Sequence, residues 1–299
     1  MHPDGWRLTE DLDAFLTRTT PFLRSRPALH TVPLTVTGTL RTHGPKAYGT
    51  EAPLFGWLEQ GGQVEAVLFH TPPHRLNLTP LTPGDAGSLA VRLAAAGHHV
   101  PGVSAEHMTA TAFAAAWRRH TAAAPVLHEC QRLYRLDALT PPAPLPPGRP
   151  RTTGADDHER LRRWKHEFGV AVGDVPPTHS ASVSASASAA VSWADTYFAD
   201  RFFTFWETDD GTPVSMAGVS PMLAGQVRVA PVYTPPGLRG HGYAGAVTAE
   251  VSRAARTAGA KEVVLFADLA NPTSNALYQR IGYRPVTDFA LYDFPSAAP

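Results

Sequence analysis

The chain has 299 residues, enough for two domains of ordinary size, and its 26 basic side chains balance its 26 acidic ones. This balance gives no reason to expect a nucleic acid or an anionic membrane as a partner. Hydrophobic residues make up 43% of the chain, but no segment reaches the roughly 18 apolar residues of a membrane span. The first residues also lack the pattern of a secretion signal. We therefore expect a soluble, cytoplasmic protein with well-packed cores.

Metal binding is not expected. The single cysteine, Cys130, has no cysteine partner for a disulfide or a metal site, and we interpret it as a small buried residue. His70 and His74 have the spacing HxxxH, but the two prolines between them prevent the helix that would bring both imidazoles onto one face.

Hydrophobic periodicity and turn residues predict the elements of the first half. Gly97 is expected to end one helix, and Ser104 to cap the next, with Glu106 in its first turn. The predicted order is helix 11–24, strands 54–58, 63–70 and 76–78, helix 85–96, strand 100–103, helix 104–120 and strand 126–136.

A proline-rich segment separates this half from the next. Residues 140–151 (TPPAPLPPGRPR) contain six prolines, which favour an extended, semi-rigid linker. We therefore predict an N-terminal domain over 1–139 and a second domain over 152–299.

The second domain has its own predicted elements. A serine- and alanine-rich stretch, 180–190, is interpreted as a surface loop. The predicted order is helices 157–168 and 191–200, a hairpin of strands 201–208 and 212–219, strand 227–233, helix 243–258, strand 262–267, helix 274–281 and strand 289–294. Both halves follow the order hairpin, strand, helix, strand, helix, strand, which indicates duplication of one fold.

The strongest functional signal is the segment 227–245, VRVAPVYTPPGLRGHGYAG. A β-branched strand ends there at two prolines, and a glycine-rich turn leads into a long helix. Glycines let the backbone approach a ligand, and unpaired N–H groups at the start of a helix attract an anion. Arg239 adds a permanent positive charge with bidentate reach. We therefore predict a site for a phosphorylated ligand.

A dinucleotide site is the competing interpretation of this turn. Gly240, Gly242 and Gly245 spell GxGxxG, and Asp268 ends the next strand, where a ribose-binding acid would lie. A dinucleotide fingerprint, however, directly follows its strand, whereas residues 234–239 intervene here. About 50 residues follow the turn, too few for the rest of a doubly wound sheet. These points exclude the dinucleotide interpretation.

Two signatures instead resemble the GNAT superfamily of acyl-CoA-dependent N-acyltransferases. Residues 239–244 (RGHGYA) match its signature R/Q-x-x-G-x-G/A. Residues 271–283 (NPTSNALYQRIGY) resemble its second signature, N-x-x-A/S-x-x-L-Y-x-x-x-G-F/Y. The resemblance spans residues 155–295. The first half has TPLTPGDAG (79–87) in the equivalent place and lacks the signature.

The chain thus resembles a tandem GNAT-like protein with a degenerate N-terminal half. This resemblance implies a mixed α/β fold of α+β type, in which each domain is a mixed, mostly antiparallel, twisted sheet flanked by helices. The first half would then have a structural role. It could complete the acceptor pocket, pack against the sheet or support a homodimer.

The resemblance also implies acetyl-CoA as cosubstrate, bound where two parallel strands splay apart. The backbone of the first strand would meet the pantetheine, and the glycine turn would hold the pyrophosphate. The implied cofactor-binding residues are Val232, Tyr233, Thr234, Arg239, Gly240, His241, Gly242, Tyr243, Ala244, Asn271, Ser274 and Tyr278.

The implied reaction is direct attack of an amine on the thioester. Tyr278 occupies the position where the family places a tyrosine near the sulfur, and its phenol would protonate the leaving thiolate. Glu207 and Asp268, each at the end of a predicted strand, are both candidates for the general base, and a chain of waters is a third. His241 is expected to face solvent or phosphate rather than the acceptor.

The acceptor itself stays open. Aromatic residues are dense between 193 and 206 and would favour an apolar or aromatic small-molecule amine. Three other functions compete with this one: a non-catalytic acyl-CoA-binding sensor, a protein N-acetyltransferase and an enzyme that acetylates the amine of a thiol sugar.

Overall fold

The structure is a computed structural model that describes residues 5–172 and 200–295. The predicted loop 180–190 lies outside the described residues, as does the predicted helix 191–200 except for its last residue. The chain forms two compact units: residues 1–133 with 266–272 and 285–299, and residues 134–265 with 273–284. The predicted domain boundaries at the proline-rich linker stay a prediction.

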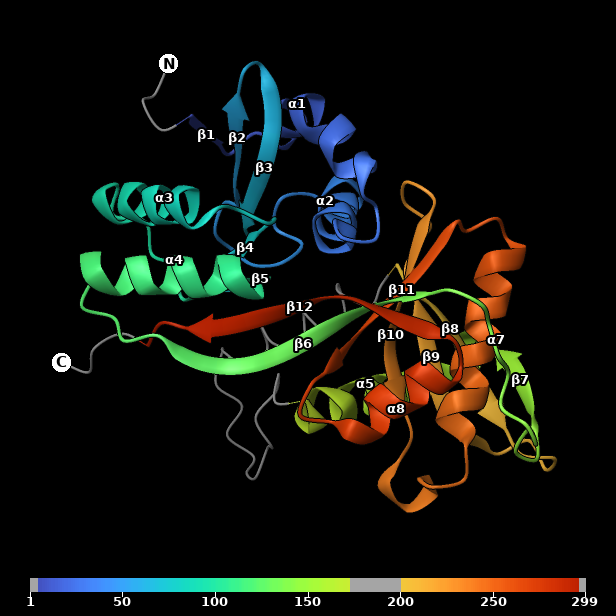
Figure 1. The fold of residues 1–299 in the computed structure, drawn as a ribbon. Coiled ribbons are helices and arrows are strands. Elements are labelled where there is room, and N and C mark those ends of the chain that lie inside the picture. The colour runs from blue at the N-terminus through green and yellow to red at the C-terminus, as the bar shows by residue number, and fades with distance from the viewer. Residues whose placement is uncertain (1–4, 173–199, 296–299) are drawn as a thin grey trace. The chain divides into compact units, whose positions relative to one another are not determined.

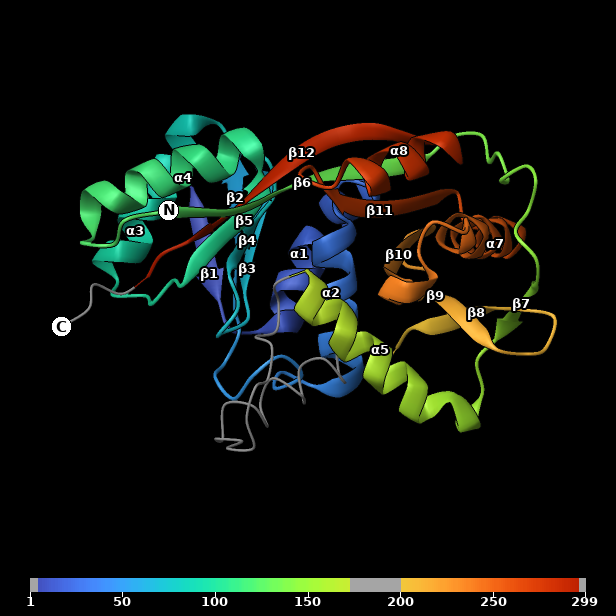
Figure 2. The same cartoon turned by 90° about the horizontal axis from the view of Figure 1, so that it is seen from below.

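The first unit is built on a sheet in the order β1-β2-β3-β4-β5-β12. Strands β4 and β5 are parallel, and the other described neighbours are antiparallel. In Figures 1 and 2, helices α1 and α2 lie on one side of this sheet, and α3 and α4 lie on the other. The bounds are β1 (Trp6–Thr9), α1 (Leu12–Ser25), α2 (Thr31–His43), β2 (Leu54–Gln60), β3 (Gln63–His70), β4 (Leu76–Leu78), α3 (Pro83–Ala95), β5 (Gly102–Glu106), α4 (His107–His120) and β12 (Tyr283–Asp293).

The predicted start of α4 was wrong. Ser104 lies inside β5 between the buried residues Val103 and Ala105, so this segment follows the two-residue period of a strand. The cap is instead Glu106, whose carboxylate accepts hydrogen bonds from the backbone N–H groups of Met108 and Thr109 at 3.1 and 3.3 Å. The strand predicted at 100–103 was therefore placed too early as well.

The sequence analysis also missed α2. Its sequence, TVPLTVTGTLRTH, is rich in residues with low helix propensity. Inside the protein, the Thr35 hydroxyl donates to the Thr31 carbonyl at 2.8 Å, and the Thr37 hydroxyl donates to the Pro33 carbonyl at 2.7 Å. These bonds satisfy the buried threonines within the helix, so tertiary burial overrides local propensity.

The second unit contains the strand order β11-β10-β9-β8-β7. Of the described pairs in this unit, β10 and β11 are parallel and the others are antiparallel. Figure 2 shows α5 and α7 on opposite faces of β8, β9 and β10. Strand β6 (Val126–Leu136) begins in the first unit and ends in the second. The other bounds are β7 (Arg149–Thr152), α5 (His158–Ala171), β8 (Phe202–Glu207), β9 (Pro213–Val219), β10 (Gln226–Tyr233), α7 (Tyr243–Thr257), β11 (Glu262–Asp268) and α8 (Pro272–Arg280).

Alternation along β8 builds the core under α5. Phe203 and Phe205 are buried two residues apart and pack with Trp164 of α5 and with Met216 and Tyr233. The Trp164 and Phe205 rings meet edge to face at 5.3 Å. This packing fixes α5 against the end of β10, where the functional signature begins. The predicted fold class, a mixed α/β fold with a mostly antiparallel sheet and flanking helices, is confirmed.

Candidate functional site

The two parallel strands of the second unit part after a short paired stretch. Residue pairs run from Gln226 and Glu262 to Arg228 and Val264, and no later pair joins these strands in the described residues. On its other edge, β10 stays paired with β9 as far as Tyr233 and Met216. The β11-facing edge of β10 beyond Arg228 therefore has main-chain groups that an extended ligand could bond as an added strand would.

A bulge in β10 accompanies this separation. The register with β9 shifts between Val229 and Val232, and Pro231 in this interval has no N–H to donate. Gly218 of β9 lies opposite. A Cβ at Gly218 would approach the Ala230 carbonyl oxygen to 2.8 Å, so only glycine lets the strands come this close. The sequence thus encodes the bulge on both strands.

The glycine turn between β10 and α7 has the conformation that its sequence predicts. Gly240 and Gly242 both have φ of +83°, in the left-handed region that favours glycine. Gly242 is the N-cap of α7, a helix of 15 residues, and no side chain caps it. The first N–H groups of α7, including those of Tyr243 and Ala244, therefore lie at an exposed turn that suits an anion.

Arg239 and His241 are exposed on this turn. The Arg239 Nε donates to the carbonyl of Thr234 at 3.1 Å, which ties the turn to the end of β10 and directs the guanidinium along it. The His241 Nδ1 lies 2.9 Å from the Arg239 carbonyl oxygen, and its ring stacks on Tyr243 at 5.7 Å. Both side chains are thus exposed next to the uncapped start of α7.

Tyr278 of α8 is buried in a cluster of tyrosines. Its ring lies 6.4 Å from that of Tyr134 and 6.1 Å from that of Tyr283. Burial raises the pKa of Tyr278 to about 12, so its phenol stays protonated and can donate a hydrogen bond at neutral pH. The Tyr134 hydroxyl donates to Asn275 at 2.8 Å, which secures α8 beside this cluster.

The second signature surrounds the start of α8. Ser274 is half-buried in the first turn of the helix. Asn271 is exposed immediately before α8, and its N–H donates to the Asp268 carbonyl at 3.1 Å. The Asp268 carboxylate accepts the Ala270 N–H at 2.8 Å and so caps the turn after β11. Asn271 and Asp268 belong to the first compact unit, whereas Ser274 belongs to the second.

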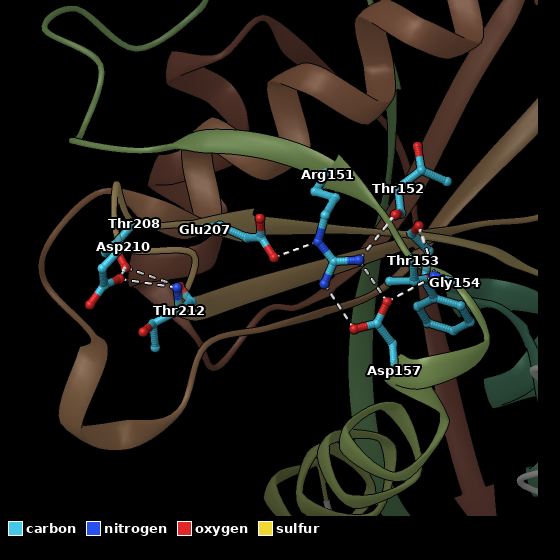
Figure 3. A network of polar contacts seen from close by, with 10 residues as sticks. Arg151, Thr152, Thr153, Gly154, Asp157, Glu207, Thr208, Asp210 and Thr212 are labelled. Carbon is cyan, nitrogen blue, oxygen red and sulfur yellow. Dashed lines mark hydrogen bonds and ion pairs between the residues drawn. The ribbon is translucent and has the colours of Figure 1, made fainter.

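Glu207, one of the predicted bases, is held in an ion-pair network (Figure 3). Its side chain is 5% exposed, and its Oε1 accepts a hydrogen bond from Arg151 Nε at 2.5 Å. The same guanidinium binds both oxygens of Asp157 at 2.7 and 2.8 Å. This engagement of Glu207 weakens its case as a base, because its Oε1 already accepts a hydrogen bond from Arg151.

Sequence analysis missed one further polar pair at the end of β10. The Tyr233 hydroxyl donates to Glu167 of α5 at 2.9 Å. Burial first, and then this hydrogen bond, raise the pKa of Tyr233 to about 12. Glu167 lies 66 residues earlier in the chain, and no local motif marks it as a partner of the strand.

Two further observations concern membrane and metal binding. Within residues 5–172 and 200–295, no helix has the length and apolar character that crossing a membrane requires. The same residues contain no group of three or more His, Cys, Asp or Glu side chains placed to hold a metal ion.

An opened pair of parallel strands, followed by a glycine turn and an uncapped helix, is the arrangement that the resemblance to acyl-CoA-dependent acyltransferases implies. Residues 174–283 match the family model of the acetyltransferase (GNAT) family. This segment is thus similar to a family that transfers acyl groups from acyl-CoA. No curated protein matches the chain.

Solved structures share the fold over nearly the whole chain. A GCN5-related N-acetyltransferase from Kribbella flavida has 16% identity and a TM-score of 0.56, over 90% of this chain and 96% of that one. A GCN5-related N-acetyltransferase from Sphaerobacter thermophilus has 17% identity and a TM-score of 0.57, over 99% of this chain and 98% of that one. A tandem GNAT protein from the clavulanic acid biosynthesis pathway has 14% identity and a TM-score of 0.56, over 98% of this chain and 100% of that one. These likenesses establish the tandem GNAT fold.

Proposed function

We propose that the protein transfers an acetyl group from acetyl-CoA to the primary amine of a small molecule, by direct attack on the thioester. The observation that carries this proposal is the open edge of β10 beyond Arg228, which ends at a glycine turn and the uncapped start of α7. A strand edge suits the amide-rich pantetheine arm, and helix N–H groups suit the pyrophosphate.

In this proposal, the pyrophosphate lies on the amides of residues 240–244 with Arg239 beside it. The pantetheine follows Val232, Tyr233 and Thr234, and Ser274 contacts its other side. A main-chain N–H of the strand near Val232 polarises the thioester carbonyl as charge develops on its oxygen.

In this proposal, Tyr278 interacts with the leaving thiolate of CoA. An ordinary thiol has a pKa of about 8.5, well below the value of about 12 for Tyr278. Full proton transfer from the phenol to the thiolate is therefore uphill. We accordingly assign Tyr278 the role of hydrogen-bonding the developing thiolate, which takes its proton from solvent as it departs.

The amine must lose a proton during the attack. Glu207 is buried and paired with Arg151, and Asp268 accepts a backbone N–H, so each carboxylate already has a partner. We therefore favour a water-mediated route to solvent for this proton. Glu207→Gln tests the alternative: a base role predicts a rate loss of about 100-fold or more, whereas the ion-pair role predicts nearly unchanged turnover of the folded protein.

The test of the function is thiol release from acetyl-CoA in the presence of a panel of small amines, amino acids and peptides. Amine-dependent release with small acceptors supports the proposal. Release with peptide termini or lysine side chains alone would instead favour a protein N-acetyltransferase. Tight CoA binding without release by any amine would favour a non-catalytic acyl-CoA sensor.

The solved tandem GNAT protein from the clavulanic acid biosynthesis pathway supports the choice of a small-molecule acceptor. The amine of a thiol sugar belongs to the same panel. The expected cytoplasmic location, the homodimer and the lack of nucleic-acid and membrane partners stay predictions.

A further inference from the structure

Arg228 is a buried cation without a carboxylate partner among residues 5–172 and 200–295. Arg228 as a whole is 5% exposed, and its Nε is buried without a hydrogen-bond partner. No hydrogen bond or ion pair to its other side-chain nitrogens is found in the described part of the chain. Its backbone, by contrast, is fully engaged. Its N–H donates to the Ser220 hydroxyl at 2.9 Å, and its carbonyl accepts the Ser220 backbone N–H at 2.9 Å and the side-chain Nη1 of Arg201 at 3.3 Å.

Two half-buried arginines of this protein, Arg132 and Arg151, have carboxylate partners. Arg132 binds both oxygens of Asp288 at 2.6 and 2.8 Å, and Arg151 binds both oxygens of Asp157. A guanidinium cannot lose its proton at physiological pH, so burying Arg228 without an anion carries an uncompensated desolvation cost. A bound oxyanion would remove this cost, and a planar carboxylate can form two parallel hydrogen bonds with a guanidinium in a bidentate pair.

Arg228 also lies at the point where the strands separate, since it is the last residue of β10 paired with β11. The pairing of Val229 with Val219 sets Arg228 opposite Ser220. Residues 216, 218 and 220 share one face by the two-residue period, and Met216 packs against α5 on that face. Arg228 is therefore on the α5 side of the sheet, the side that also carries Tyr233.

The proposed function fixes the direction from which an acceptor arrives. The pyrophosphate lies at the glycine turn beyond the carboxyl end of β10, so the pantetheine runs back along the strand and its acyl end points toward Arg228. An acceptor that meets the acyl carbon must come from this amino-terminal half of β10. Arg228 and Val232 are four positions apart, on the order of 13 Å of strand at ~3.3 Å per residue.

We propose that Arg228 binds a carboxylate of the acceptor, and that several bonds separate this carboxylate from the reacting amine. The acceptor class is thus an amino acid whose reactive amine is remote from its carboxylate, rather than a simple alkylamine or a polyamine. This inference rests on the proposed acetyl transfer.

The test compares ω-amino acids of increasing length, from 3-aminopropanoate to 6-aminohexanoate, with alkylamines and ω-amino carboxamides of the same lengths. We expect a lower KM for the longer amino acids than for their carboxamides. The variant Arg228→Met should erase this difference and raise the KM for the amino acids about 10- to 100-fold, because a charge-assisted pair is lost. Arg162→Met, which removes an exposed cation from α5, is the matched control and should change neither KM.

Thermal unfolding separates ligand binding from a structural role. Without ligand, Arg228→Met should melt at the same or a higher temperature than the parent protein, because the variant no longer buries an unpaired charge. A lower melting temperature together with an unchanged preference for carboxylates would overturn the inference. Aminoalkyl phosphates of matched length form a second arm, and an Arg228-dependent preference for phosphates alone would overturn the assignment of a carboxylate.

The failure of the proposed function would be recognised separately. If no amine in the panel releases thiol, acetyl transfer to small amines is wrong. The inference is then tested by whether 6-aminohexanoate raises the melting temperature of the parent protein and leaves that of Arg228→Met unchanged. If alkylamines and carboxamides react as well as the amino acids, the function stands and the role of Arg228 is refuted.

Discussion

The Arg151 guanidinium joins two acidic side chains, Asp157 before α5 and Glu207 at the end of β8 (Figure 3). Replacing Arg151 with methionine leaves the Glu207 carboxylate, 5% exposed, without its cation. Removing one partner of a buried pair costs about 3–5 kcal/mol. Because the Arg151 side chain is itself 38% exposed, water can partly solvate the remaining carboxylates. We therefore expect a loss of about 3 kcal/mol in the free energy of unfolding.

Glu207→Gln should cost much less, about 1 kcal/mol, because its amide can still accept a hydrogen bond and Arg151 keeps its pair with Asp157. The double variant should cost less than the two single costs combined, with a coupling energy of about 2 kcal/mol. Arg253→Met is the control, since it removes an exposed pair with Glu250 and should change stability by less than about 0.5 kcal/mol.

Chemical denaturation of the four variants, followed by fluorescence and circular dichroism, measures these free energies. Arg151 holds the pKa of Asp157 below its usual value, so this pair stabilises the protein above about pH 4. The contribution is lost as pH falls through the lowered pKa, and Arg151→Met should flatten this acid dependence. A cost below about 1 kcal/mol for Arg151→Met, or a cost for Glu207→Gln that exceeds the cost of Arg151→Met, would refute the ion-pair account.

Three further predictions concern single side chains. Tyr278→Phe should lower kcat about 10- to 100-fold with little change in CoA affinity. Tyr283→Phe should cost about 1 kcal/mol of stability, because its hydrogen bond to Ser252 is lost, and should leave kcat intact. Equal rates for both variants would refute the role of Tyr278 at the thiolate. Arg239→Gln should weaken CoA binding about 10-fold, and less so at high salt, while Arg162→Gln should not; titration calorimetry measures both. Burial lowers the pKa of His70 to about 4, so this histidine favours the folded state above pH 6.5. Its contribution to the free energy of unfolding falls by about 3 kcal/mol as pH drops from 6.5 to 4. Denaturation of His70→Gln across this range should show a flatter pH dependence than the parent protein, and an unchanged slope would argue against this assignment.

The glycine turn could be predicted from the sequence because its conformation is local. Gly240 and Gly242 adopt φ of +83°, which residues with side chains rarely do, so the residue types directly indicate the backbone path. The opening of the strands was implied only by family resemblance. It depends on where the register between β10 and β11 ends, and this pairing involves residues more than 30 positions apart in the chain, such as Arg228 and Val264.

The environment of Glu207 was beyond local reasoning for the same cause. Its partner Arg151 lies 56 residues earlier, at the end of a segment that composition alone marks as a linker. In the structure, these last residues form β7 and pair with β8. Glu207 at the end of β8, which the sequence suggests is available as a base, is therefore held in an ion pair with a residue distant in the chain. Arg228 escaped notice in a similar way, because its residue type fits an exposed strand position while its burial is set by the fold.

The central claim is that the glycine turn at the start of α7 holds the pyrophosphate of acyl-CoA. Gly242→Glu places a negative charge where the phosphates would lie, and Gly259→Glu is its matched control at the opposite end of the same helix. Both glycines have positive φ, +83° and +95°, and neither has an atom closer than 4.0 Å to an added Cβ, so the backbone strain is shared. Titration calorimetry with acetyl-CoA should show at least about a 100-fold loss of affinity for Gly242→Glu, with parental affinity for Gly259→Glu. Equal affinities for the two folded variants would contradict the account.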